Sequence, residues 1–131
     1  MLLPALSEEV AVVDPWTLTS AEEFAAATAD AATIGRFVVA VGRRNAEAIR
    51  DCDLLVACLD GQEVDSGTAA EGGFASALGI RCHGLRTDLR RAGEEGAVVN
   101  LQVQAFIEMS GGRIAGSLEE LIEDLRRAAP A

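Results

Sequence analysis

Four short apolar runs alternate along the chain with segments whose apolar residues recur at helical spacing. The runs cover residues 10–13, 54–59, 80–85 and, more weakly, 113–115. The run at 54–59 is continuously apolar, which is typical of a strand covered by helices on both faces of a parallel sheet. Between the runs, helices are predicted over residues 20–32, 68–78, 98–109 and 117–128. This alternation predicts a single α/β domain over residues 1–131, a doubly wound parallel sheet flanked by helices.

Residues 33–50 fit two patterns. The segment Phe37-Val38-Val39-Ala40-Val41 has the β-branched content of a strand. The spacing of Ile34, Phe37, Val41, Ala48 and Ile49 equally describes one apolar stripe on a helix. We expect a helix, because residues 45–50 continue the pattern without a turn signal.

The charge balance excludes some partners. The chain has 131 residues, and 11 Lys+Arg against 21 Asp+Glu give a net charge of −10. Nucleic acid and anionic membranes are therefore not expected as partners, because phosphate recognition draws on clustered basic residues. Disorder is not expected either, since half of the residues are hydrophobic.

The chain's ends and its cysteines indicate a cytoplasmic protein without a metal. The first nine residues lack the basic start and long apolar run of a secretory signal, and no window is apolar enough to span a bilayer. Cys52, Cys58 and Cys82 are odd in number and form no C-x-x-C pair, so we expect neither a disulfide framework nor a zinc site. The single histidine, His83, sits in an apolar run and is expected in the core.

Two carboxylates flank the loop that follows the second apolar run. This run ends at Asp60-Gly61, and the chain continues through Asp65 and a Ser66-Gly67-Thr68 turn into a helix that carries Glu71. Ligands of such sheets bind beyond the carboxyl ends of the strands. One ionised carboxylate beside a second acid is what glycosyl chemistry requires, because one stabilises or attacks the sugar and the other handles the leaving group's proton.

Glu71 has a competing structural interpretation. Thr68-Ala69-Ala70-Glu71 has the form of a capping box, in which Thr68 would cap the helix and Glu71 would bond back to the cap. Ser20…Glu23 and Ser117…Glu120 have the same form, so the pattern by itself favours a structural role. Its position in the first turn of a helix at a strand's carboxyl end favours a functional one.

The order of these residues resembles the nucleoside 2-deoxyribosyltransferase family, over residues 45–125. The resemblance rests on Asp53-Leu54-Leu55-Val56-Ala57, Asp60-Gly61, Asp65-Ser66-Gly67-Thr68-Ala69-Ala70-Glu71, Asn100-Leu101-Gln102 and Gly111-Gly112-Arg113-Ile114. It implies a flavodoxin-like or Rossmann-like sheet and transfer of a deoxyribosyl group between nucleobases. It also implies nucleoside or nucleotide and nucleobase ligands and no cofactor.

The resemblance assigns roles to individual residues. Glu71 matches the nucleophile that attacks the anomeric carbon, and Asp65 matches the acid that serves the departing base. Asn45 matches a position near base and sugar. Asn100 and, more loosely, Gln102 match residues that complete the site of a neighbouring subunit, so a homo-oligomer is implied. Further substrate contacts are expected from the two loops at the strand ends, at Asp60, Gly61, Ser66, Gly67, Thr68 and Asp88.

The chain departs from the family in two places. Members begin with a strand, central in the sheet, and a loop that can carry a Tyr; here residues 10–13 resemble the second strand, the first has no counterpart and Tyr is absent. We therefore expect an amino-terminally shortened member, with an incomplete site or a wrongly placed start. Gly72-Gly73 follows Glu71 where an aliphatic residue and a Gly are usual, which could leave room for a larger base.

Two other functions stay open. Water could take the second step and make the protein a hydrolase of nucleosides or nucleoside 5′-monophosphates, with the phosphate held at the Ser66-Gly67-Thr68 helix start or by Arg86. A catalytically silent nucleotide-binding module is the other possibility. Trp16, the single Trp, could stack on a base or serve in packing.

Overall fold

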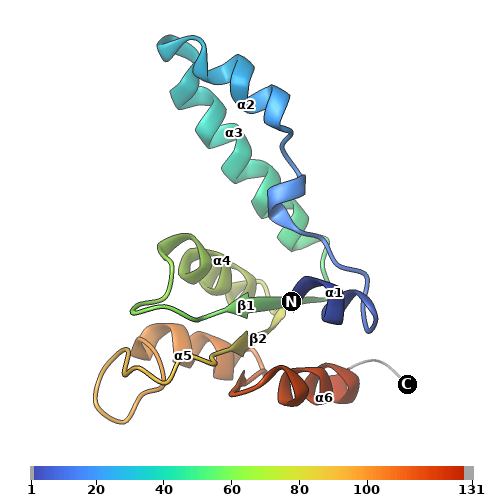
Figure 1. Ribbon diagram of the computed structural model, residues 1–131, viewed down its shortest axis with the longest axis vertical. Helices are drawn as coiled ribbons and strands as arrows, with labels where there is room; N and C mark the ends of the chain where they lie inside the picture. The colour runs from blue at the N-terminus through green and yellow to red at the C-terminus, as the bar shows by residue number, and fades with distance from the viewer. Residues whose placement is uncertain (1, 129–131) are drawn as a thin grey trace.

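The computed structural model describes residues 2–128, which form an α/β fold (Figure 1). Its elements in chain order are α1 (Leu2–Ser7), a 3-10 turn (Pro15–Thr17), α2 (Ala21–Thr28), α3 (Ala31–Arg50), β1 (Leu54–Cys58), α4 (Ser66–Ala77), β2 (Arg81–Leu85), α5 (Leu101–Met109), β3 (Ile114–Ala115) and α6 (Leu118–Ala128). The strands predicted at 54–59, 80–85 and 113–115 are thus confirmed, with ends shifted by one residue.

The three strands form one parallel sheet in the order β1-β2-β3. Leu54 pairs with Arg81 and Ala57 with Gly84 across β1 and β2, and Gly84 pairs with Ile114 across β2 and β3. The parallel sheet confirms the predicted fold class. Because all strands are parallel, the loops after β1 and β2 leave the sheet at the same end, beyond the carboxyl ends of the strands. The candidate site residues lie in these loops or directly after them.

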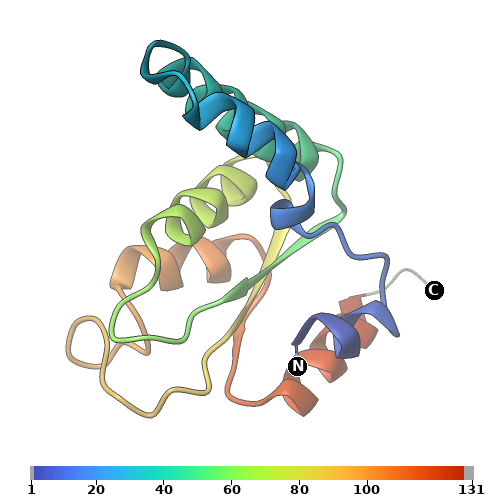
Figure 2. The same ribbon diagram turned by 45° about the horizontal axis from the view of Figure 1, so that its top comes forward.

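Helices cover both faces of the sheet (Figure 2). On one face, α4 and α5 enclose a core that contains Leu59, Ala75, Val99 and Ile107. On the other face, α1 and α6 enclose a second core of Leu6, Leu85, Ala115, Leu121 and Leu125. Each fully buried leucine contributes roughly 1.5–3 kcal/mol to folding, so these two layers hold the strands in place.

The α2–α3 hairpin projects from the sheet, as Figure 1 shows. The helix expected over 33–50 is confirmed by α3, whereas the single helix expected over 20–32 is wrong because it divides at Ala29-Asp30. The Asp30 side chain accepts a hydrogen bond of 2.9 Å from the Ala32 N–H and so begins α3. Phe24 and Phe37 meet edge to face, with ring centroids 5.1 Å apart.

The strand predicted at residues 10–13 is wrong. These residues belong to no helix or strand, and Val12 and Val13 are exposed. A strand requires a partner that hydrogen-bonds to its backbone, and none of the described strands pairs with this segment. Sequence reasoning also missed α1, whose Leu6 is buried against α6.

Two glycines with opposite surroundings test the packing. A methyl group on Gly112 would overlap the backbone carbonyl of Cys82 in β2, whereas one on Gly35 in α3 would meet nothing within 4 Å. We expect Gly112→Ala to lower the free energy of unfolding by about 1–3 kcal/mol. Gly35→Ala, the matched control, should raise it by about 0.5–1 kcal/mol, because alanine favours a helix interior. Urea unfolding measures both, and equal effects would contradict the packing described.

Candidate functional site

A cleft of about 360 Å³ lies beside β1. This volume falls within the range of roughly 300–1,000 Å³ that is usual for small-molecule sites. Its walls are formed by β1, α1, the segment 10–14 and the ends of α3 and α4. Apolar side chains dominate, and the polar lining residues are Asp14, Asn45, Cys52, Cys58, Thr68 and Glu71.

Glu71 lies in the second turn of α4 and lines this cleft. Its half-buried position and the nearby negative charge of Asp65 together raise the pKa of its carboxyl group above the ordinary value of 4.5. The capping-box interpretation is wrong for Glu71, and so is its placement in the first turn. The helix begins two residues earlier than expected, at Ser66, and Asp65 is its N-cap.

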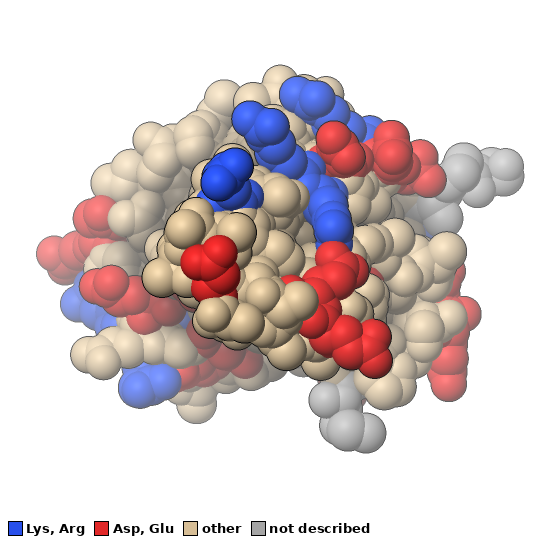
Figure 3. Space-filling model, turned by 90° about the horizontal axis from the view of Figure 1, so that it is seen from above, with Lys and Arg blue, Asp and Glu red and all other residues tan. Residues whose placement is uncertain are grey.

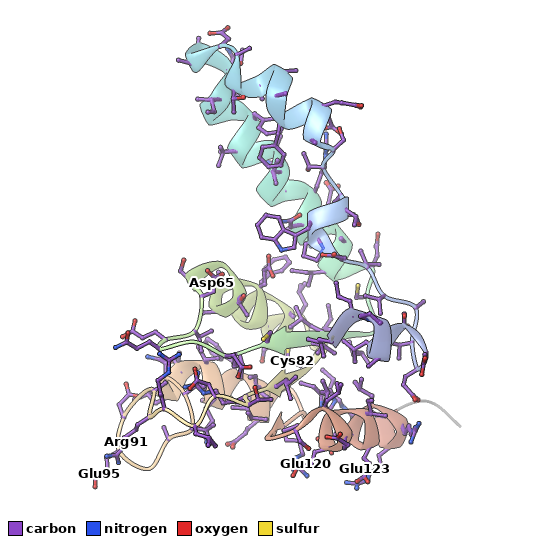
Figure 4. All side chains as sticks on the ribbon, viewed as in Figure 1. Asp65, Cys82, Arg91, Glu95, Glu120 and Glu123 are labelled. Carbon is purple, nitrogen blue, oxygen red and sulfur yellow. The ribbon has the colours of Figure 1, made fainter. Side chains whose placement is uncertain are left out.

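Asp65 caps α4 through one carboxylate oxygen. Oδ2 accepts hydrogen bonds from the Thr68 N–H at 3.0 Å and from the Thr68 hydroxyl at 3.3 Å. Figure 4 shows the side chain at the start of α4, far from Glu120 and Glu123 on α6. The hydrogen bonds of Asp65 within residues 2–128 use Oδ2 alone, so Oδ1 is available to other groups. Asp65 does not line the cleft, although its charge acts on Glu71.

In the other two sequences of this form, the serine accepts the hydrogen bond that the pattern predicts for the cap. The Glu23 N–H donates to the Ser20 hydroxyl at 3.1 Å, and the Glu120 N–H donates to the Ser117 hydroxyl at 3.2 Å. In α4 the N-cap is Asp65 and not Thr68. Glu71 is therefore not needed to cap the helix, and it lines the cleft.

Asn45, near the end of α3, also lines the cleft. Its Oδ1 atom is buried and accepts no hydrogen bond from the described residues. A buried amide oxygen without a donor is costly, by about 1–3 kcal/mol. A ligand that donates a hydrogen bond at this point would remove that cost.

Asp14 and Trp16 form one rim of the cleft. The Asp14 carboxylate accepts a hydrogen bond of 3.0 Å from the Trp16 N–H and begins the 3-10 turn. Trp16 is 87% exposed, so it does not serve in packing. Sequence reasoning considered the tryptophan and passed over Asp14, whose signal was its place directly after an apolar run.

Asp60, Gly61 and Asp88 hold two loops together instead of lining the cleft. The Asp60 carboxylate accepts from the Thr87 and Asp88 N–H groups, and Asp88 accepts from the Gly61 N–H. Burial would raise the pKa of Asp60, but hydrogen bonds from the Thr87 hydroxyl and from the Asp88 and Thr87 N–H groups hold it below its ordinary value. Bonds from Arg90 lower the pKa of Asp88. The carboxylates are thus engaged by the chain itself.

Arg86 reinforces the same loop junction. It is 5% exposed, and its guanidinium donates to the carbonyl oxygens of Leu59 at 2.7 Å, Gly61 at 2.6 Å and Arg90 at 2.8 Å. The positive charge of Arg86 is therefore neutralised by backbone carbonyl groups, and the side chain does not line the cleft.

Asn100 and Gln102 lie at the start of α5, outside the cleft that holds Glu71. Asn100 Oδ1 accepts from the Gln102 N–H at 2.9 Å and caps the helix, which shortens the element expected over 98–109. Within one chain, these residues and Glu71 are not brought together.

The remaining candidates are structural. His83 is buried in β2, as expected, and burial lowers the pKa of its imidazole. A methyl group on Gly73 would lie 3.4 Å from the Phe106 ring of α5, so that glycine serves helix packing rather than a larger base. Over the described part of the chain, no cluster of three or more metal-ligating side chains occurs. No helix between residues 2 and 128 is long and apolar enough to cross a membrane.

These features define an α/β protein with a carboxylate cleft beside the first strand of a parallel sheet. The family model for nucleoside 2-deoxyribosyltransferase matches residues 6–109, and the chain belongs to this family. It is also similar to a solved structure described as a conserved protein from Enterococcus faecalis V583, at 28% identity and a TM-score of 0.55. The match covers 95% of this chain and 76% of that one. Among curated proteins, none matches significantly.

The electrostatic link between Asp65 and Glu71 is testable. We expect Asp65→Asn to lower the pKa of Glu71, because a like charge is removed, while leaving it above 4.5 through burial. Asparagine caps a helix as well as aspartate does, so the free energy of unfolding should hardly change. Asp65→Ala should lower the pKa similarly and cost about 1 kcal/mol of stability. Carbon-detected NMR titration and urea unfolding measure the two quantities. An unchanged Glu71 pKa in Asp65→Asn would contradict the link.

Proposed function

We propose that this protein cleaves the N-glycosidic bond of 2′-deoxynucleosides and transfers the deoxyribosyl group to a second nucleobase through Glu71. The observation that carries the proposal is the position of this carboxylate. It faces a ligand-sized cleft beside the unpartnered Asn45 Oδ1 and under the influence of Asp65. Family membership supports the same chemistry.

The reaction would proceed in two displacements. An ionised Glu71 oxygen bonds to the anomeric carbon while the bond from that carbon to the base nitrogen breaks, and the electron pair leaves with the base. Asp65, which is hydrogen-bonded to the lining residue Thr68, would supply a proton or a hydrogen bond to that nitrogen through Oδ1 from the margin of the cleft. A nitrogen of the incoming base then attacks the anomeric carbon, its proton is taken up by Asp65, and Glu71 leaves as a carboxylate.

The base and sugar would meet different walls. Trp16 offers an exposed aromatic face at the rim, on which a planar base can stack. Asn45 and Asp14 offer acceptors to sugar hydroxyls or base N–H groups, and Thr68 in the first turn of α4 also lines the cleft, whereas Ser66 and Gly67 do not. Asp60, Gly61 and Asp88 would act indirectly, by fixing the loops after β1 and β2.

Hydrolysis is the second candidate, because the cleft is open and water could replace the acceptor base. A 5′-monophosphate is the less favoured substrate. The Asp65 carboxylate occupies the start of α4, where it would repel a phosphate, and Arg86 is engaged by carbonyl groups. We therefore favour an uncharged nucleoside.

We further propose that the protein acts in the cytoplasm, in nucleoside salvage, as a homo-oligomer. Asn100 and Gln102 could then reach the cleft of a neighbouring subunit. The hairpin supports self-association, because Phe24, Val38 and Val39 expose apolar surface on it. Figure 3 looks onto this end of the molecule, where basic side chains form a row beside acidic ones, amid large uncharged areas.

Glu71→Gln tests the reaction. The protein is incubated with a 2′-deoxynucleoside, with and without a second free base, and the products are separated by chromatography. We expect a new nucleoside only when the acceptor base is present, and a loss of about 10³-fold or more in Glu71→Gln, because the amide is not a nucleophile. The rate should fall as the pH drops through the Glu71 pKa, which lies above 4.5.

Glu63→Gln is the matched control, since Glu63 is exposed and lies outside the cleft. It removes the same charge and should leave turnover unchanged. Release of free base to the same extent with and without the acceptor base would show that the protein is a hydrolase and not a transferase. If neither purine nor pyrimidine deoxynucleosides are turned over, transfer and hydrolysis are both contradicted, and a nucleotide-binding module without activity is favoured.

Trp16 provides a direct signal for ligand binding, because it is the single tryptophan of the chain. We expect deoxynucleosides to quench its fluorescence in a saturable way, with the base stacked on the indole ring. Trp16→Phe should keep turnover within a few-fold, and Trp16→Ala should raise KM more than it lowers kcat. Since the side chain is 87% exposed, neither variant should alter the unfolding midpoint. A linear, non-saturating response would show that the ring does not contact the base.

A further inference from the structure

The side chains that line the cleft offer more hydrogen-bond acceptors than donors. When ionised, the carboxylates of Asp14 and Glu71 can only accept. The Thr68 hydroxyl donates its proton to Asp65 Oδ2 at 3.3 Å, so its lone pairs are what remain for a ligand. The outer edge of β1, which pairs with no other described strand, offers N–H and C=O groups alike. The side chains therefore set the balance toward acceptors.

No positive charge offsets this balance among the described residues that line the cleft. Arg44 precedes Asn45 in α3, but its guanidinium donates to Glu23 at 2.7 Å and to the Leu18 carbonyl at 3.2 Å. The side-chain donors along the walls are neutral, and they come from Asn45, Trp16, Cys52 and Cys58. A ligand with N–H groups to donate matches these walls better than one with carbonyl oxygens.

Asp14 is placed to meet the edge of a nucleobase. Its Oδ1 atom accepts a hydrogen bond from the Trp16 N–H at 3.0 Å, and the hydrogen bonds of this carboxylate within residues 2–128 use Oδ1 alone. The residue is half-buried, and a hydrogen bond made to Oδ2 is stronger where water is partly excluded. Asp14 and Trp16 belong to one turn, so a base stacked on the exposed indole ring would lie beside the free Oδ2 atom.

Asn45 supplies a second acceptor from α3. Figures 1 and 2 both show the 3-10 turn beside the carboxyl-terminal end of α3, and Asn45 lines the same cleft as Asp14. Its Oδ1 atom is buried and has no donor among the described residues. An exocyclic amino group carries two hydrogens and can serve two acceptors. A ring N–H serves one acceptor and brings a carbonyl oxygen alongside it, which Asp14 cannot satisfy.

We propose that the cleft selects nucleosides whose base carries an exocyclic amino group, as adenine and cytosine do, and that Asp14 is the residue that enforces this selection. The inference rests on the proposed function, since it takes a nucleoside as the ligand of this cleft. Asn45 accommodates both classes of base, because an amide can accept from an N–H and donate to a carbonyl. Asp14 can only accept, so it disfavours bases with a carbonyl at the same position, as in hypoxanthine and uracil.

Matched nucleosides test the selection. 2′-Deoxyadenosine is compared with 2′-deoxyinosine, and 2′-deoxycytidine with 2′-deoxyuridine, because each pair exchanges an amino group for a carbonyl and the accompanying ring proton. Isothermal titration calorimetry of Glu71→Gln measures the affinities, since the amide is not a nucleophile and the nucleosides are not consumed. We expect the amino member of each pair to bind about tenfold or more tightly, because the carbonyl leaves the Asp14 carboxylate without a donor.

Asp14→Asn, made in the same Glu71→Gln protein, identifies the residue responsible. Asparagine caps a helical turn as well as aspartate does, so Trp16 should keep its place, and an unchanged near-ultraviolet circular dichroism spectrum checks this. The new amide can turn an N–H toward a carbonyl, so the preference within each pair should fall to about twofold or less. Glu63→Gln removes one negative charge outside the cleft and should leave the preference unchanged.

A preference that is lost in Asp14→Asn and retained in Glu63→Gln supports the inference. Equal affinities within each pair, or tighter binding of the carbonyl member, would overturn the selection and leave the proposed function standing. A preference that survives Asp14→Asn would overturn the role of Asp14. If none of the four nucleosides gives saturable binding, the nucleoside site is contradicted, and the selection with it.

Discussion

The parallel pairing of β1 with β2 is the interaction on which the rest of the structure depends. It brings the loop after β1 beside the loop after β2, where Asp60 and Asp88 join them. It also fixes the start of α4, and with it the position of Glu71. Buried Arg86 completes this junction by binding carbonyl groups of both loops. The site is therefore built at the carboxyl end of the sheet. Asp60 and Asp88 hold its loops together, whereas Glu71 faces the cleft.

Asp65 connects stability and chemistry in one side chain. One of its oxygens begins α4, and its charge raises the pKa of Glu71. A raised pKa means that the folded protein holds the Glu71 proton more tightly than the unfolded chain. This group therefore favours folding most at low pH, and that contribution is lost as the pH rises from 4.5 through the raised pKa. At neutral pH the ionised carboxylate is retained at some cost to stability, as is usual for a functional group.

The described chain leaves unusually much apolar surface open. The hairpin helix α3 has no buried residue along its 20 positions, and β1 is covered on one edge only. Both elements contribute residues to the cleft that Asn45 and Glu71 line.

The sequence by itself determined the three strands of the sheet, the long helix over 33–50 and the order of the residues around Glu71. Continuous apolar runs and helical spacing are local signals, so they can be recognised without knowing which segments pack against them. Only the tertiary structure decided that Asp65 rather than Thr68 begins α4, that Asp60 and Asp88 bind loops instead of ligand, and that residues 10–13 form no strand. Each of these depends on which partner a polar or backbone group finds in space, and a capping pattern or a β-branched run does not specify its partner.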